Sequence, residues 1–225
     1  MVHVYAFVIN ALELVGTVAF AISGALLAIN RRCDVFGIIW LALTTAVGGG
    51  IIRDVVLGRV PPASFQNPVY IIEALVTTLV ILLVTHRYGN PGKVKTFNMF
   101  SDVYIICDAL GLGVYTMSGM NAAIDCGHGH NLFLLLFVGV ITGVGGGMIR
   151  DMMAGRTPMV LKREIYAIAC VVGAICYYFL IMKLERSPAM LIGAAIVTGV
   201  RLISYYMKIS FPIAGRGLLM PKKED

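Results

Sequence analysis

The chain has 225 residues, of which 59% are hydrophobic and 13% are charged, and its mean hydropathy is +0.87. Globular proteins carry charges at roughly a quarter of their positions, so this composition excludes an ordinary soluble domain and indicates an integral membrane protein. A bilayer-spanning helix needs about 20 apolar residues, and seven such helices would leave no room for a separate catalytic domain. The net charge of +6 indicates basic loops on a cytoplasmic face rather than a nucleic-acid partner.

In chain order, continuous apolar windows predict helices at about residues 4–28, 36–57, 69–85, 101–123, 132–154, 165–182 and 189–207. The segments 59–68 and 86–95 contain proline, asparagine and glycine and predict loops. The expected fold is therefore all-α, a polytopic membrane protein with seven transmembrane helices.

The distribution of basic residues predicts how these helices are oriented. With seven spans, 13 of the 18 Lys and Arg fall on the side of the C-terminus, four fall on the side of the N-terminus, and Arg201 lies inside the last helix. The positive-inside rule then places the N-terminus outside and the C-terminus in the cytoplasm.

An internal repeat is the most informative feature of the sequence. Residues 45–61 (TAVGGGIIRDVVLGRVP) and 142–158 (TGVGGGMIRDMMAGRTP) are identical at 11 of 17 positions, and the similarity extends upstream to residues 13–28 and 108–123. Each unit holds three helices, an odd number, so the second unit must enter the membrane in the opposite sense. We expect a first three-helix repeat at 1–95, a second, inverted repeat at 96–185, and a seventh helix with a basic cytoplasmic tail at 186–225.

Each repeat carries a glycine triplet at a depth near the middle of the membrane. Three glycines lower helix propensity by about 1 kcal/mol per residue relative to alanine, and they predict a kink or local unwinding that frees backbone carbonyls. Such carbonyls could act as ligands for a cation moving between the repeats. The alternative is that the glycines only allow two helices to pack closely.

An Arg-Asp pair follows each triplet, and charges inside a membrane are usually functional. Each arginine could pair with an acid on a neighbouring helix. The candidate acids are Glu13, Glu73, Asp102 and Asp108, of which Glu13 and Asp108 are related by the repeat. The arginines could equally lock helices together, whereas the two aspartates after them are expected to concentrate cations at a mouth. Arg201, inside the last helix, could sense voltage or pair with an acid, and we expect the pairing.

The candidate residues therefore fall into two groups. The candidate ion pathway comprises Thr45, Gly48, Gly49, Gly50, Thr142, Gly145, Gly146, Gly147, Asp54, Asp151, Ser23 and Ser118. The candidate structural or gating charges are Arg53, Arg150, Glu13 and Asp108.

Other chemistries have little support in the sequence. The loop DCGHGH contains Asp125, Cys126, His128 and His130, but its spacing is unlike that of a structural zinc site, and an outer turn is the simpler interpretation. The triplet motifs contain neither GxGxxG nor a phosphate-loop lysine. We therefore expect neither an enzyme nor a resident metal.

The duplicated GGGxxRDxxxGRxP motif, at residues 48–61 and 145–158, and the Ser-Gly motifs upstream resemble the trimeric intracellular cation (TRIC) channel family. The resemblance is to its bacterial branch, also called UPF0126 or the glycine transporter family. It implies a homotrimer in a bacterial inner membrane, with a potassium-permeable pore in each subunit that is kinked at the triplets of helices two and five. It implies no cofactor besides permeating potassium and bound lipid. Animal members have a gating lysine in helix four, but residues 101–123 contain none.

Two other functions remain open from the sequence. Inverted repeats with broken helices also build secondary transporters, for a small substrate such as glycine. A membrane scaffold without transport activity is the third possibility.

Overall fold

The structure, a computed structural model, describes residues 2–88, 94–162 and 165–207, and every regular element in these ranges is helical. The long helices are α1 (Val2–Asn30), α2 (Val35–Val56), α4 (Val69–Tyr88), α5 (Val94–Ala123), α6 (Leu132–Met153), α8 (Ile165–Leu180) and α9 (Arg186–Tyr206). The short elements are α3 (Ala63–Gln66), α7 (Met159–Lys162) and the π-helical turn η1 (Ile124–His128). The all-α fold predicted from the sequence is confirmed.

Six of the described helices are long and apolar enough to cross a membrane. Helix α8 is apolar but has 16 residues, so it spans about 24 Å at 1.5 Å per residue, less than a typical hydrocarbon core. The predicted turn at Asn90, Pro91 and Gly92 and the basic tail after residue 207 lie outside the described residues.

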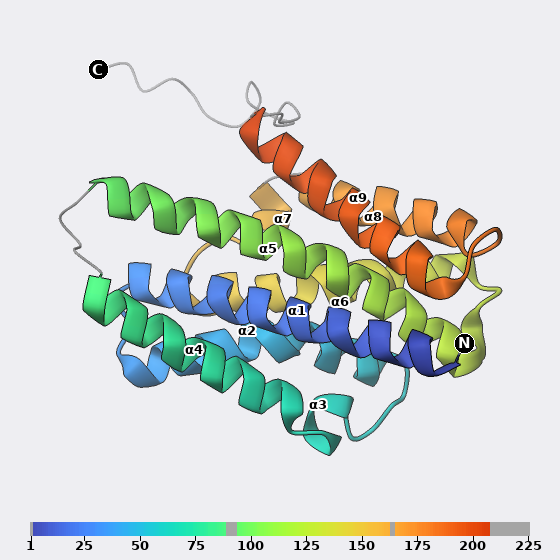
Figure 1. The fold of residues 1–225 in the computed structure, drawn as a ribbon, viewed down its shortest axis with the longest axis horizontal. Coiled ribbons are helices and arrows are strands. Elements are labelled where there is room, and N and C mark those ends of the chain that lie inside the picture. The colour runs from blue at the N-terminus through green and yellow to red at the C-terminus, as the bar shows by residue number, and fades with distance from the viewer. Residues whose placement is uncertain (1, 89–93, 163–164, 208–225) are drawn as a thin grey trace, which may run out of the picture.

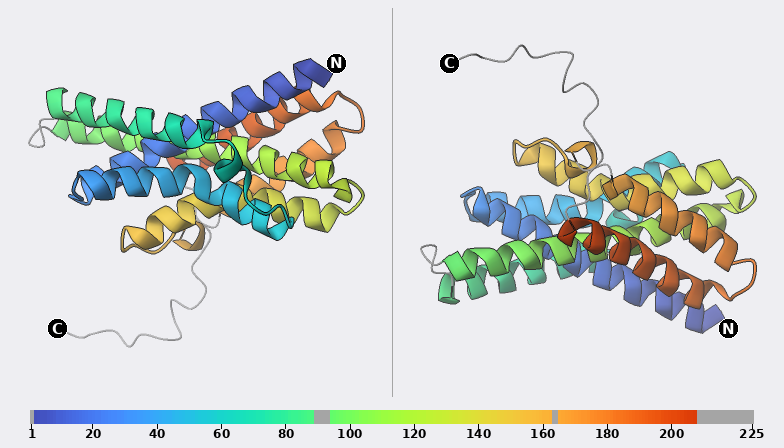
Figure 2. Two further views of the ribbon diagram at one scale, coloured as in Figure 1. Left: turned by 90° about the horizontal axis from the view of Figure 1, so that it is seen from below. Right: turned by 90° about the horizontal axis from the view of Figure 1, so that it is seen from above.

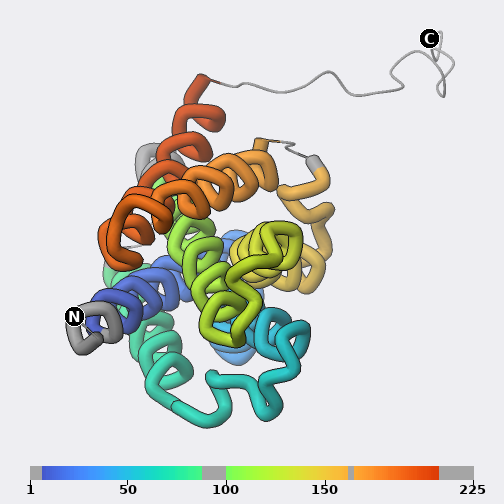
Figure 3. The backbone as a smooth tube through the Cα atoms, turned by 90° about the vertical axis from the view of Figure 1, so that its right-hand side faces the viewer, coloured from blue at the N-terminus to red at the C-terminus, as the bar shows by residue number. Residues whose placement is uncertain are grey.

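The helices form one elongated bundle with their axes roughly along its length (Figure 1). Seen from its end (Figure 3), α5 runs near the centre of the bundle, where it contacts α1, α6, α8 and α9. Helices α4 and α9 lie on opposite sides, as the views from below and above show (Figure 2). Many large apolar side chains of α4 are exposed, as expected for a helix that faces lipid or another subunit.

The two triplet helices, α2 and α6, begin and end in the same way. The side chain of Asp34 accepts a hydrogen bond from Gly37 N at the start of α2, and that of Asn131 accepts one from Leu134 N at the start of α6. Gly58 and Gly155, just beyond their ends, have φ of +71° and +64°, which glycine adopts without strain. Equivalent signals thus define both helices.

The glycine triplets do not unwind these helices. Both α2 and α6 keep helical backbone from end to end, so the predicted local unwinding at the triplets is not observed. Instead α2 and α6 are packed against each other. A methyl group at Gly49 would overlap the Thr142 carbonyl, and one at Gly146 would overlap the Thr45 carbonyl. The packing role that the sequence left open is the one that the structure displays.

We predict that alanine at either middle glycine destabilises the protein. Gly49→Ala and Gly146→Ala each force a Cβ into a backbone carbonyl, so we expect a loss of about 1–3 kcal/mol, typical of overpacking. Thermal unfolding in detergent measures the effect. Gly50→Ala is the matched control, because its Cβ would meet only Arg53 Nη2, at 3.9 Å. Equal unfolding temperatures for the three variants would contradict the packing role.

Candidate functional site

A buried arginine lies one helical turn beyond each triplet, and the first is Arg53. Its Nε donates to Asp54 Oδ1 at 2.8 Å, and its Nη1 donates to Ser118 Oγ at 2.9 Å. Nη1 also lies 3.5 Å from Glu13 Oε1, which accepts a hydrogen bond from Ser118 Oγ at 2.5 Å. One guanidinium thus joins helices α1, α2 and α5.

The second arginine, Arg150, has the same partners from the other repeat. Its Nε donates to Asp151 Oδ1 at 2.9 Å, and its Nη1 donates to Asp108 Oδ1 at 2.6 Å and to Ser23 Oγ. The side chain is completely buried. Each arginine therefore takes an acid from its own half of the chain and a serine from the other half, so the halves are hydrogen-bonded to each other.

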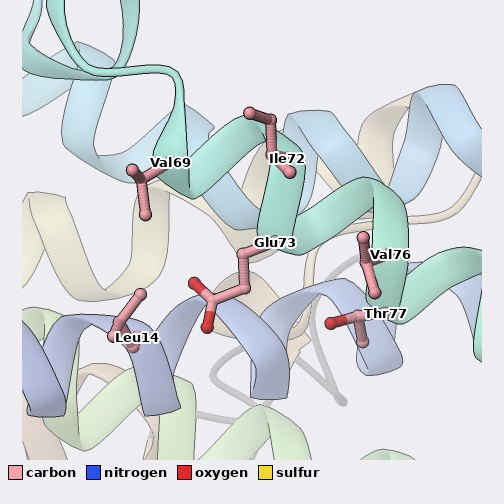
Figure 4. Close-up of a pocket in the computed structure, with 6 residues that line it drawn as sticks. All are labelled: Leu14, Val69, Ile72, Glu73, Val76 and Thr77. Atoms are coloured by element: carbon pink, nitrogen blue, oxygen red, sulfur yellow. The ribbon is translucent and has the colours of Figure 1, made fainter.

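These contacts agree with only some of the pairings considered from the sequence. Glu13 and Asp108, the repeat-related acids, do pair with the arginines. The adjacent Arg-Asp residues also bond directly, which the sequence did not require. Asp102 is exposed, and Glu73 forms no ion pair among the described residues. The Glu73 carboxylate instead points from α4 toward α1, beside Leu14, in an apolar groove that Figure 4 shows.

The two aspartates expected at the mouths are buried. Asp54 Oδ2 accepts from Ala63 N at 2.8 Å, and Asp151 Oδ2 accepts from Met159 N at 2.8 Å. The carboxylates therefore anchor the short helices α3 and α7 that follow α2 and α6. Because both are buried and each accepts hydrogen bonds on both oxygens, the geometry gives them a structural role and does not support the expected role of concentrating cations.

The two halves differ around these shared contacts. In the first half, Tyr70 Oη donates to Glu13 Oε2 at 2.6 Å, and a cavity of about 70 Å³ opens beside Glu13, Gly50 and Arg53. In the second half, Tyr104 Oη bonds to Arg156, whose guanidinium also pairs with Asp151 at 2.7 Å.

In the second half, the space around Arg150 is filled by the Tyr104 ring and Arg156. Arg150 and Arg156 each have their guanidinium carbon over the Tyr104 ring, at 5.0 and 5.4 Å from the ring centroid. The first arginine therefore borders a small open space, while the second is sealed.

The hydroxyl-bearing candidates lie beside the triplets. Thr45 Oγ1 donates to the Leu41 carbonyl and Thr142 Oγ1 to the Val138 carbonyl, each at 2.5 Å, so both hydroxyls are bonded within their own helices. The glycines of the Ser-Gly motifs, Gly24 and Gly119, allow close approach to these threonines.

Arg201 pairs with no acid among the described residues, contrary to the expectation from the sequence. It is 1% exposed, and no described acidic side chain forms an ion pair with it. Its guanidinium carbon lies 4.7 Å from the centroid of the Tyr166 ring, and its Nη2 donates to Met159 Sδ at 3.7 Å. An aromatic face replaces the carboxylate.

The loop with Asp125, Cys126, His128 and His130 forms no metal centre in the described part of the chain, where His, Cys, Asp and Glu gather in no group of three or more that could hold a metal ion. Asp125 instead pairs with Arg186 at 2.8 Å.

Sequence reasoning missed three tyrosines and one arginine of the site: Tyr70, Tyr104, Tyr166 and Arg156. Tyr70 and Tyr166 could have been found, because each is the second residue of the long helix that follows its repeat motif. Arg156 is part of the duplicated GRxP motif, but its counterpart Arg59 is exposed. Tyr104 has Ile9 at the equivalent position 95 residues earlier, so the repeat gives no signal for it.

Comparison with known proteins agrees with this duplicated site. A family model described as "Glycine transporter" matches the chain twice, at residues 10–86 and 105–182. The inner membrane protein YadS of Escherichia coli, of the UPF0126 family, is 36% identical over 202 residues, covering 88% of this chain and 93% of its own. A UPF0126 protein of Vibrio cholerae is 35% identical over 89% of this chain and 80% of its own.

Solved structures extend the comparison to the fold. A prokaryotic TRIC channel in 0.5 M KCl superposes with a TM-score of 0.81 at 28% identity, over 91% of this chain and 100% of that chain. The TRIC orthologue of Rhodobacter sphaeroides gives 0.79 at 28% identity, over 90% and 99%. A third TRIC cation channel gives 0.74 at 32% identity, over 90% and 95%. The chain belongs to the bacterial UPF0126 branch of the TRIC channel family.

We predict that Asp108 contributes more than Glu13 to the stability of this TRIC family member. Asp108→Asn leaves the fully buried Arg150 without one of its charge partners, and we expect a loss of about 3 kcal/mol or more. Glu13→Gln should cost less, because Glu13 is 18% exposed and borders the cavity. Denaturant unfolding in detergent compares them. A larger loss for Glu13→Gln would contradict the difference in burial.

Proposed function

We propose that the chain is a monovalent cation channel that is permeable to potassium, with a pathway inside each subunit between α2 and α6. The observation that supports it most directly is the contact of two glycine triplets between these helices, with an arginine cluster beyond each. The similarity to structures of TRIC cation channels along 90% of the chain or more supports the same function.

The proposed topology has seven membrane helices, with α8 as the shortest. Residues 1–95 and 96–185 would be two inverted three-helix repeats, and residues 186–225 would hold the seventh helix and the basic tail. Two observations favour this arrangement. One family model matches the chain twice, and each arginine bonds to a serine from the other half. We place the N-terminus outside and the C-terminus in the cytoplasm, in a bacterial inner membrane, as the excess of basic residues near the C-terminal side suggests.

We propose a homotrimer with a pathway in each subunit, on the basis of similarity to trimeric TRIC channels. The exposed apolar face of α4 is suited to contact lipid or a neighbouring subunit. Potassium would be the permeating ion rather than a bound cofactor, and no other cofactor is proposed.

Conduction requires a change at the centre of the subunit. The Thr45 and Thr142 carbonyls contact the opposite triplet, so α2 and α6 must separate there before a hydrated ion can pass. Separation would expose carbonyls and glycine backbone from both helices, together with the hydroxyls of Ser23 and Ser118 at the arginine clusters. These are the oxygen ligands that can replace part of a cation's hydration shell.

The test is reconstitution of the purified protein in a planar bilayer with a potassium gradient. We expect unitary currents that reverse near the potassium equilibrium potential. Saturable glycine exchange without a resolvable conductance would replace the channel with a secondary transporter, the function for which the matching family model is named. If neither current nor exchange is observed, the scaffold function remains.

Leucine at the last glycine of either triplet should block this current. Gly50 borders the small cavity, with only Arg53 Nη2 near its side-chain position, so a leucine can fill that space without disturbing the helix contact. Gly147→Leu tests the second half. We expect at least a tenfold loss of potassium flux in proteoliposomes while the protein still assembles, corresponding to about 1.4 kcal/mol.

Gly199→Leu is the matched control, because this glycine of α9 has no atom within 4 Å of its side-chain position. Its flux should equal that of the wild type. Unchanged flux in both Gly50→Leu and Gly147→Leu would remove the triplets from the pathway.

A further inference from the structure

Arg201 is the buried charge that the repeat does not explain. It lies on α9, outside the duplicated segments, and is almost completely buried without an acidic partner among the described residues. Burying a guanidinium without a carboxylate is costly, so its position requires a compensating contact or a role. Besides the weak bond to Met159 Sδ, the guanidinium lies over the ring of Tyr166 of α8.

Tyr166 connects Arg201 to the second triplet. Its ring lies under the Arg201 guanidinium, and its hydroxyl lies 3.0 Å from the point where a side chain of Gly147 would begin. Arg150 Nη2 lies 3.5 Å from the same point. The phenol hydroxyl therefore forms part of the wall beside the last glycine of the triplet, next to the arginine of that half.

Unsatisfied polar atoms are concentrated in this region. Five buried side-chain atoms lack a hydrogen-bond partner in the described part of the chain, and four of them belong to one group of neighbours: Asp108 Oδ2, Arg150 Nη2, Tyr166 Oη and Arg201 Nε. Buried polar groups rarely remain unpaired without a functional or structural reason. The Tyr166 hydroxyl is thus held in place by the contacts of its ring rather than by a hydrogen bond of its own.

The equivalent tyrosine of the first half is held differently. Tyr70 donates to Glu13 Oε2 at 2.6 Å. The acid of the second half is Asp108, whose side chain is one methylene shorter, and its Oδ2 has no partner. The first half fixes its tyrosine through a hydrogen bond within the repeat, whereas the second half uses an arginine from the additional helix.

We propose that Arg201 is a positioning residue, which holds the Tyr166 hydroxyl at Gly147 and thereby lets α9 set the shape and polarity of the pathway in its second half, beside Arg150. This inference rests on the proposed channel function. Without the guanidinium over its ring, the phenol can turn away from the glycine, and the wall there becomes apolar. Apolar constrictions impede ions by losing water.

The first experiment measures the position of Tyr166 without any transport. The protein is labelled with fluorotyrosine, and the ¹⁹F resonance of Tyr166 is identified by its loss in Tyr166→Phe. We expect Arg201→Met to shift or broaden this resonance, and Arg201→Lys, which keeps a cation over the ring, to restore it in part. Ser204→Ala is the control, because Ser204 is also buried on α9. A resonance unmoved by Arg201→Met would overturn the proposal.

The second experiment is a double-mutant cycle on unitary potassium conductance. We expect Arg201→Met and Tyr166→Phe each to lower the conductance by at least about threefold, and the double variant to equal Tyr166→Phe alone. Additive losses would mean that Arg201 acts through its own charge and not through Tyr166. A lower unfolding temperature with unchanged conductance in Arg201→Met would reduce it to a structural role.

The wild-type recording separates this inference from the function on which it rests. If the wild type carries no potassium current, the proposed channel function fails. If it carries the current and Arg201→Met behaves identically, only the positioning role of Arg201 fails.

Discussion

The burial of two guanidinium groups is the constraint on which the rest of this structure depends. An arginine inside a membrane protein must be neutralised and must have its donors satisfied, or its desolvation costs several kcal/mol. Arg53 and Arg150 are each neutralised by an acid from their own half and bonded to a serine of the other half. The bonds that stabilise the buried charges therefore also join the two halves.

The glycine triplets make these bonds possible. A serine on α1 can reach an arginine on α6, and a serine on α5 can reach one on α2, because the central helices approach each other closely. Side chains at Gly49 or Gly146 would force α2 and α6 apart. Close packing at the triplets and the bonds of the arginine clusters thus depend on each other, and the separation of α2 and α6 in the proposed pathway would strain the clusters.

The sequence predicted the helices and the acidic partners because both follow from composition and duplication. Glu13 and Asp108 were identifiable as partners since the repeat relates them. Whether a glycine triplet unwinds or packs depends on what faces it, and spacing along one helix contains no information about the facing helix. For the same reason the Tyr166 ring opposite Arg201 was not predicted, and an acid was expected instead.

The two halves differ in contacts that their shared sequence motif does not predict. Glu13 bonds to its tyrosine, whereas Asp108 Oδ2 has no partner; in the second half α9 contacts the tyrosine, and Arg156 contacts Tyr104. The first cluster borders a cavity and the second is sealed. Fewer contacts therefore surround Arg53, and in the proposed pathway the larger share of the energy for opening would fall on the Arg150 side. The helix outside the repeats lies against that side.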